Sequence, residues 1–151
     1  MWRGVQGPVT ALIATSCGWR FGVSPTPSIS AGRVDGATVE LGLLADLRGS
    51  LVSRLAELGS ATGSPLDLHV VGLDHAAEWA TPGEGVAVMR STLRVAWSVG
   101  QCTGEVGATR RWTMPTGHAA EVIPLRAEVV RTLAADAVAH AVDAVAAAPC
   151  P

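Results

Sequence analysis

The sequence of 151 residues predicts an α+β fold, a two-layer sandwich in which two helices pack on one face of a small, mostly antiparallel sheet. Three observations predict it: a leucine stripe at helical spacing, segments in which apolar and polar residues alternate, and a long apolar helix near the C-terminus. Helices at both ends of a run of strands are expected to share one face of the sheet. The length suits a single domain with its own core.

The first helix is predicted over 40–58, and Gly59 ends it. Its apolar residues recur at intervals of three and four: Leu44, Leu47, Leu51, Leu55 and Leu58. A strand follows at 64–71, where alternate residues are apolar and His69 falls on the polar side. We expect His75 in a surface loop after this strand, and a short strand around 37–39 could precede the helix.

A long hairpin is predicted over 86–99 and 106–114, around a turn at 100–105. Each strand has one apolar face, and the two apolar faces coincide only if the numbers of paired residues add up to an odd total. Pairing Val99 with Val106 satisfies this condition. The same register places Arg94 opposite Arg111 on the other face.

These two arginines, together with Arg90 on the same face, form the candidate anion-binding site. Like charges directly opposite each other destabilise a sheet unless they are screened. Guanidinium groups bind phosphate and carboxylate, so an anionic ligand could supply the screening. The alternative is that the arginine side chains simply extend into water.

The second helix is predicted over 125–147, between Pro124 and Pro149. It has a broad apolar face rich in alanine and valine and a narrow polar stripe. Such a face is expected to pack closely onto the sheet, with His140 on the side exposed to water.

Residues 1–16 are predicted to be a lipoprotein signal peptide, because Arg3 precedes an apolar run and small residues lead to Cys17. In such signals the cysteine is acylated and becomes the first residue of the mature chain. Residues 17–36 are then the lipid anchor and a tether rich in proline and serine, and 37–151 form the domain. The alternative is a buried strand with Cys17 as a core thiol, because Gly7 and Pro8 weaken the apolar run.

Composition excludes several classes of function. The formal net charge is −2 and the pI is about 6.0, so nucleic acid is not an expected partner. Three cysteines form no CxxC pair and have no zinc-like spacing from the four histidines, so we expect no metal and no cofactor. An oxidising compartment would allow Cys102 and Cys150 to form a disulfide; two unpaired thiols are the alternative.

Enzymatic activity is not expected, because the sequence has no nucleophile elbow, zinc-protease motif, phosphate loop or telling carboxylate pair. The remaining catalytic alternative is Ser98 or Cys102 as a nucleophile beside His118.

The order of these elements resembles that of the LPS-assembly lipoprotein family (LptE). The resemblance comprises Cys17, Gly18 and an aromatic residue, a proline-containing spacer, a helix, a strand, a hairpin and a closing helix. It implies a non-enzymatic outer-membrane lipoprotein facing the periplasm, which plugs and helps assemble a β-barrel translocon for lipopolysaccharide and binds that lipid's phosphorylated sugars. It also implies that Cys17 is acylated. The alternative is a lipoprotein accessory subunit of an envelope transporter, or another periplasmic binding module.

Overall fold

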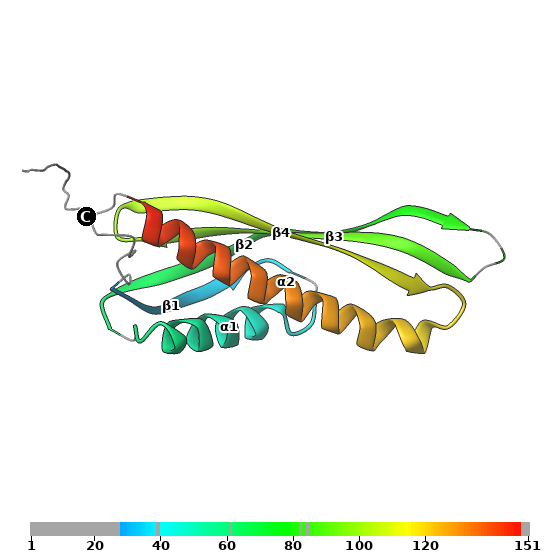
Figure 1. The fold of residues 1–151 in the computed structure, drawn as a ribbon, viewed down its shortest axis with the longest axis horizontal. Helices are drawn as coiled ribbons and strands as arrows, with labels where there is room; N and C mark the ends of the chain where they lie inside the picture. The colour runs from blue at the N-terminus through cyan, green and yellow to red at the C-terminus, as the bar shows by residue number, and fades with distance from the viewer. Residues whose placement is uncertain (1–27, 39, 61, 82, 84, 149–151) are drawn as a thin grey trace, which may run out of the picture.

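The computed structural model describes residues 28–38, 40–60, 62–81, 83 and 85–148, which form one four-stranded sheet and two helices. In chain order the elements are β1 (Ile29–Gly36), α1 (Leu43–Glu57), β2 (Ser64–Thr81), β3 (Val86–Val99), β4 (Cys102–Pro115) and α2 (Ala119–Ala147). The sheet order is β1-β2-β3-β4, with β1 parallel to β2 and the other neighbours antiparallel. Both helices lie on one face (Figure 1), so the predicted α+β sandwich is confirmed.

Strand β1 corrects the predicted extent of the tether, since Ile29–Gly36 is part of the sheet and not of the spacer at 17–36. Ile29 and Val34 are buried, but a bulge between Ala31 and Val34 breaks their alternation. The Asp67 carboxylate fills the bulge and accepts a hydrogen bond from the Arg33 amide at 2.7 Å. Helix α1 then provides the crossover that a parallel strand pair requires.

The core lies between the sheet and the helices. Helix α1 begins at Leu43, three residues later than predicted, and buries Leu43, Leu47, Leu51 and Leu55. Helix α2 begins at Ala119, six residues earlier than predicted, and continues through Pro124. A proline there removes one backbone donor, and the surrounding turns are exposed to water. The buried residues of α2 are Val130, Leu133, Ala134, Ala137, Val138, Ala141 and Val142.

The β3–β4 turn is much tighter than the predicted turn at 100–105. Only Gly100 and Gln101 connect the strands, and Val99 pairs with Cys102. Gly100 has a φ of 57°, in the left-handed region that two-residue hairpin turns require. The predicted odd total is confirmed, but the register is shifted, because β4 begins four residues earlier than expected.

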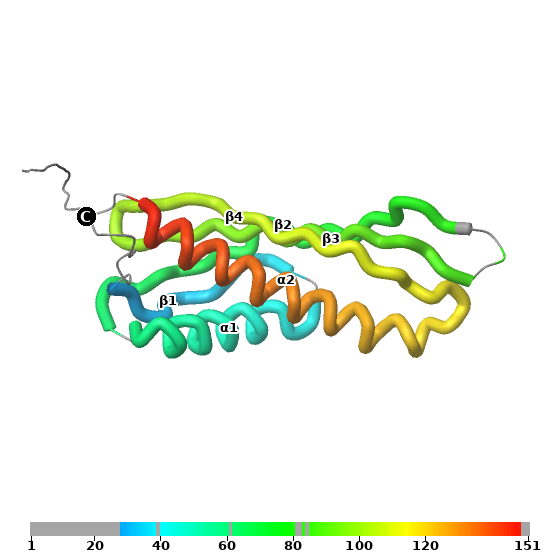
Figure 2. Tube along the Cα trace, in the orientation of Figure 1, coloured from blue at the N-terminus to red at the C-terminus, as the bar shows by residue number. Residues whose placement is uncertain are grey.

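Strand β2 extends ten residues beyond the predicted strand, whereas β1 pairs only with residues 64–70 of β2. The sheet beyond β1 therefore has three strands, covered only by the beginning of α2 (Figures 1 and 2). We call this part, residues 71–81, 86–94, 107–115 and 119–129, the distal arm. No helix in the described part of the chain is long and apolar enough to cross a membrane.

Candidate anion-binding surface and the polar network beneath it

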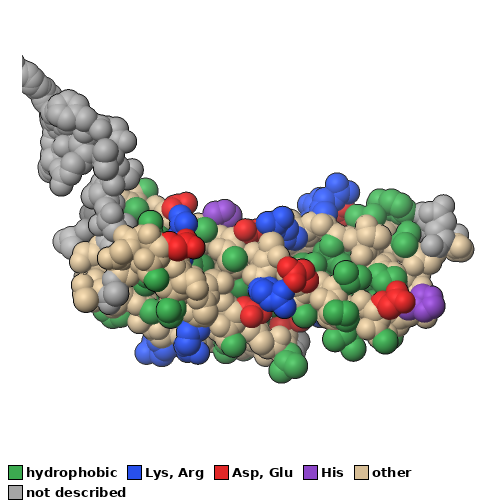
Figure 3. Space-filling model, turned by 60° about the horizontal axis from the view of Figure 1, so that its bottom comes forward, with side chains coloured by type: hydrophobic (Ala, Val, Ile, Leu, Met, Phe, Trp, Pro, Cys, Tyr) green, Lys and Arg blue, Asp and Glu red, His purple; other side chains and the backbone are tan. Residues whose placement is uncertain are grey.

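Arg90 and Arg111 lie directly opposite each other on the open face of the sheet, the face that the helices do not cover. On the side of the molecule that Figure 3 presents, positive and negative side chains are interspersed. Both donate to one carboxylate: Arg90 Nη2 to Glu78 Oε2, and Arg111 Nε to Glu78 Oε1 at 2.8 Å. The arginine side chains are 54% and 63% exposed, and that of Glu78 is 20% exposed. We call these three residues the arginine pair and its counterion. They carry one excess positive charge.

A bulge in β2 sets this arrangement. The register between β2 and β3 shifts between Ala77 and Trp79, which leaves Glu78 without a partner in the ladder. Ala76, two residues before Glu78, pairs with Arg90, and the Glu78 carboxylate reaches the two guanidinium groups. The sequence pattern did not predict Glu78 at this site, because an alternating pattern contains no sign of an extra residue.

Arg94 does not pair with Arg111, which corrects the predicted register. It is opposite Gly107 and not Arg111, and its Nη1 lies 3.3 Å from Glu105 Oε2. All three predicted arginines do occupy the open face, but only two of them come together. The physical reason is the two-residue turn, which moves every β4 residue four positions relative to β3.

The open face near β1 is of mixed charge. A cavity of about 610 Å³ lies there, and its charged lining comprises Arg33, Asp35, Asp67, His69 and Glu105. His69 Nδ1 lies 2.6 Å from Asp35 Oδ1, and this hydrogen bond holds the pKa of Asp35 below its ordinary value. His69 faces the polar side, as the sequence predicted. Excess positive charge is therefore a property of the arginine pair and not of the whole face.

A polar network lies on the other side of the sheet, behind the arginine pair. Ser91 is fully buried, and its Oγ lies 2.6 Å from His75 Nδ1 and 2.9 Å from Trp112 Nε1. His75 Nε2 lies 2.9 Å from Glu40 Oε1, which also accepts from Arg126 of α2. His75 is thus part of β2, which corrects the prediction that it lies in a surface loop.

Every hydrogen bond of this network has one donor and one acceptor when His75 carries a single proton, on Nε2. His75 then donates to Glu40 and accepts from the Ser91 hydroxyl, while Trp112 donates to Ser91. The hydrogen bond from Arg126, assisted by that from His75, lowers the pKa of the Glu40 carboxyl, although burial acts in the opposite direction.

Serine, histidine and carboxylate in a row are also found in hydrolases, where the serine must reach a substrate carbonyl. Here the Ser91 hydroxyl is enclosed by the sheet and α2, so it has no such access. The network instead links the loop before α1, all three strands of the distal arm and α2. Its effect is to fix the distal arm to the rest of the domain.

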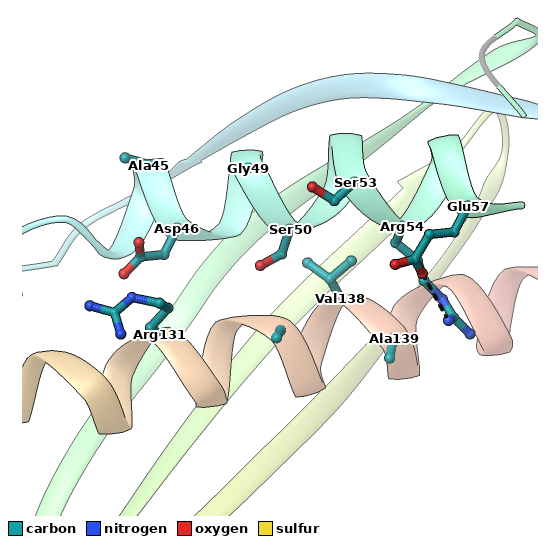
Figure 4. Close-up of a pocket in the computed structure, with 11 residues that line it drawn as sticks. Ala45, Asp46, Gly49, Ser50, Ser53, Arg54, Glu57, Arg131, Val138 and Ala139 are labelled. Carbon is teal, nitrogen blue, oxygen red and sulfur yellow. Dashed lines mark ion pairs between the residues drawn. The ribbon is translucent and has the colours of Figure 1, made fainter.

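A groove runs between α1 and α2 on the outer surface of the helical layer (Figure 4). Its volume is about 470 Å³, and most of the residues that line it are small: Ala45, Gly49, Ser50, Ser53, Ala135 and Ala139. An ion pair of 3.6 Å between Arg54 and Glu57 lies at one end. None of the residues predicted to bind a ligand lines this groove.

Other predicted site residues are far apart or outside the described residues. Ser98 and Cys102 flank the β3–β4 turn, whereas His118 follows the opposite end of β4, so the catalytic alternative built on them is wrong. Cys17 and Cys150 lie outside the described residues, and both acylation and the Cys102–Cys150 disulfide stay predictions. Within the described ranges, no group of three or more His, Cys, Asp and Glu side chains could hold a metal ion.

Comparison with known proteins identifies bacterial lipoproteins of similar fold. No protein-family model and no curated protein matches the sequence. A minor lipoprotein from Acinetobacter baumannii is 11% identical, with 79% of this chain and 93% of that chain covered and a TM-score of 0.48. Rare lipoprotein B from Shewanella oneidensis is 12% identical, with 78% and 92% covered and a TM-score of 0.49.

A lipoprotein from Caulobacter crescentus is 13% identical, with 75% and 87% covered and a TM-score of 0.44. Likenesses of this size do not carry a functional argument.

Proposed function

We propose that the protein is a lipid-anchored, non-enzymatic component of the outer membrane that faces the periplasm. It docks with a β-barrel translocon for lipopolysaccharide and binds the phosphorylated sugars of that lipid. The observation that carries the proposal is the arginine pair, in which two guanidinium groups from neighbouring strands converge on one carboxylate on an uncovered sheet face.

The chemistry of the arginine pair suits a phosphate group. Arg90 and Arg111 are held close together although both are positively charged, and Glu78 supplies the compensating charge. A phosphate monoester has more negative charge than a carboxylate and presents more acceptor oxygens. It can therefore bind between guanidinium groups that are already oriented, and Glu78 limits how tightly it binds.

The shape of the domain supports docking with a barrel. Strand β2 has 18 residues, so the sheet is about 60 Å long at about 3.3 Å per residue. The distal arm carries only the beginning of α2 on one face and projects beyond β1 and α1 (Figure 1). A long and narrow body of this kind suits the lumen of a barrel with many strands.

The proposed lipid anchor is an acyl group on Cys17, and it is inferred from the sequence. Cys17 precedes a spacer that is shorter than predicted, because the sheet already begins at Ile29. A Cys17→Ala variant is expected to move from the membrane fraction to the soluble fraction, whereas Cys102→Ala should stay with the membrane. Unchanged fractionation of Cys17→Ala would overturn the anchor.

Co-purification tests the partner. Tagged protein extracted from membranes in mild detergent is expected to bring down an outer-membrane β-barrel protein in stoichiometric amount. Recovery of an inner-membrane permease in its place would support the alternative, an accessory subunit of an envelope transporter. That alternative shares the anchor and the fold but needs no arginine pair.

A further inference from the structure

Charged and apolar side chains occupy successive rows on the open face of the distal arm. One row holds the arginine pair, since Arg90 and Arg111 lie opposite each other in β3 and β4. The next row toward the end of β2, at the right-hand end of Figure 1, joins Trp79, Val88 and Thr113. Residues two apart on a strand point to the same face and lie about 7 Å apart. This second row therefore lies directly beside the arginine pair.

The bulge in β2 places Trp79 on the open face. Without the extra residue Glu78, strict alternation would put Trp79 on the same face as Ala77, the face that the helices cover. With the bulge, Trp79 pairs with Val88 and points to the open face with it. The same irregularity therefore brings the counterion of the arginine pair and an indole ring to one place.

The open face beyond the arginine pair is apolar. Trp79 is 51% exposed, whereas Val86, Val88 and Pro115 are half-buried, and Val86 pairs with Pro115. We call these four residues the apolar patch. The stretches 85–89 and 112–117 contain no charged residue. An exposed indole beside half-buried aliphatic side chains offers a surface on which a hydrocarbon chain loses contact with water.

Polar side chains occupy the row on the other side of the arginine pair. Asp74 pairs with Thr92 and Thr92 with Thr109, and the two threonine hydroxyl oxygens lie 3.3 Å apart. We call these three residues the threonine row, and it too lies about 7 Å from the arginine pair. Hydroxyl groups donate and accept hydrogen bonds, and a carboxylate accepts them. Such a set suits the hydroxyl groups of a sugar.

We propose that the ligand of the open face is an acylated sugar phosphate. Its sugar lies over the threonine row, its phosphate at the arginine pair and its acyl chain along the apolar patch. The excess positive charge of the arginine pair complements the phosphate. The inference rests on the proposed function, because it takes the arginine pair as the phosphate site, and it adds which part of the glycolipid is recognised.

The order of the rows distinguishes this ligand from simpler phosphates. A phosphorylated sugar without an acyl chain would leave Trp79 and Val88 in contact with water. A phosphorylated hydrocarbon without a sugar would leave the threonine row without a partner. The three features together span about 14 Å along the strands, so one ligand that carries all three groups reaches each of them.

Calorimetric titration of the full-length protein with three soluble probes tests the proposal. N-octanoylglucosamine phosphate has all three groups, N-acetylglucosamine phosphate lacks the long acyl chain, and octyl phosphate lacks the sugar. The protein is held in nanodiscs of neutral phosphatidylcholine, and titration of empty nanodiscs gives the contribution of the bilayer. We expect the first probe to bind at least about five-fold more tightly than either of the others.

Two outcomes with the wild type would overturn the proposal. Equal affinity for the octanoyl and acetyl probes would mean that the apolar patch does not bind the acyl chain. Equal affinity for the octanoyl probe and octyl phosphate would mean that the sugar is not recognised.

Substitution of Trp79 locates the acyl chain. Trp79→Ala should lower affinity for the octanoyl probe about five- to ten-fold and leave affinity for the acetyl probe unchanged, whereas Trp79→Phe should keep most of the affinity. Ile123→Ala is the matched control, because Ile123 is an apolar residue of α2 that is 71% exposed. Circular dichroism checks that each variant is folded. A folded Trp79→Ala that binds the octanoyl probe like the wild type would overturn the proposal.

The combination of Arg90→Glu with Arg111→Glu separates this proposal from the proposed function. If the double variant loses affinity for lipopolysaccharide while Trp79→Ala binds every ligand like the wild type, the phosphate site stands and the acyl-chain contact is wrong. If the double variant binds lipopolysaccharide as tightly as the wild type, the proposed function itself is wrong.

Discussion

Arg90 and Arg111 lie directly opposite each other in the β3–β4 ladder, and both donate to the Glu78 carboxylate. Two like charges in this position repel each other. The carboxylate offsets the repulsion and orients both guanidinium groups toward one point above the sheet. The same carboxylate competes with any anion that binds there, so stability and binding depend on Glu78 in opposite directions.

Glu78→Gln is expected to separate these two effects. The free energy of unfolding should fall by about 1 kcal/mol, because the repulsion between the arginines is no longer offset. Affinity for lipopolysaccharide should rise, because the ligand no longer displaces a carboxylate. Urea titration and calorimetry measure the two quantities, and Glu105→Gln, beside Arg94, is the matched control. Weaker binding by Glu78→Gln would mean that the anion does not bind at the arginine pair.

Ser91→Ala tests the buried network. The substitution leaves Trp112 Nε1 and His75 Nδ1, which are partly buried, without their hydrogen-bond partner. A loss of about 1 to 3 kcal/mol is expected in the free energy of unfolding. Thr92→Ala, the next residue on the open face, should change it by less than about 0.5 kcal/mol. Equal losses of unfolding free energy in the two variants would show that the buried network does not stabilise the fold.

Glu40→Gln tests the pH dependence of the same network. The pKa of Glu40 is lowered in the folded protein, chiefly by Arg126. Its ionised form therefore stabilises the fold above the unfolded pKa, near 4.5, and this contribution disappears as the pH falls through the lower folded pKa.

The difference in unfolding free energy between wild type and Glu40→Gln should therefore be constant near neutral pH and shrink below about pH 4.5. Asp35, whose pKa is also lowered, is present in both proteins and cancels in the difference. A difference that grew toward acid pH would show that Glu40 is not stabilised in its ionised form.

Some of the fold followed from simple periodicity. Leucines at intervals of three and four predicted α1, and strand parity placed Arg90, Arg94 and Arg111 on one face. Parity alone could not say which arginines are neighbours, because that depends on the length of the turn. A glycine able to adopt a positive φ at position 100 allowed a two-residue connection, and the register moved with it.

Irregular strands account for what the sequence did not predict. The bulge beside Arg33 separates the buried Ile29 and Val34 by an odd number of residues, so β1 had no alternating pattern. The bulge at Glu78 also interrupts the alternating pattern, so the sequence did not predict Glu78 as the counterion of the arginine pair. His75 entered a network with Glu40 and Arg126, and such contacts between distant elements leave no local pattern.

Charge reversal at the arginine pair tests the central claim most directly. Full-length protein in detergent is titrated with lipopolysaccharide, and Arg90→Glu with Arg111→Glu is compared with Arg33→Glu combined with Arg131→Glu. The latter arginines are also exposed and paired with a carboxylate, but lie elsewhere. Circular dichroism checks that both double variants are folded. Loss of two charge-assisted contacts predicts affinity at least about ten-fold weaker for the first double variant, with near wild-type affinity for the second. Equal affinity of the two double variants would contradict the account.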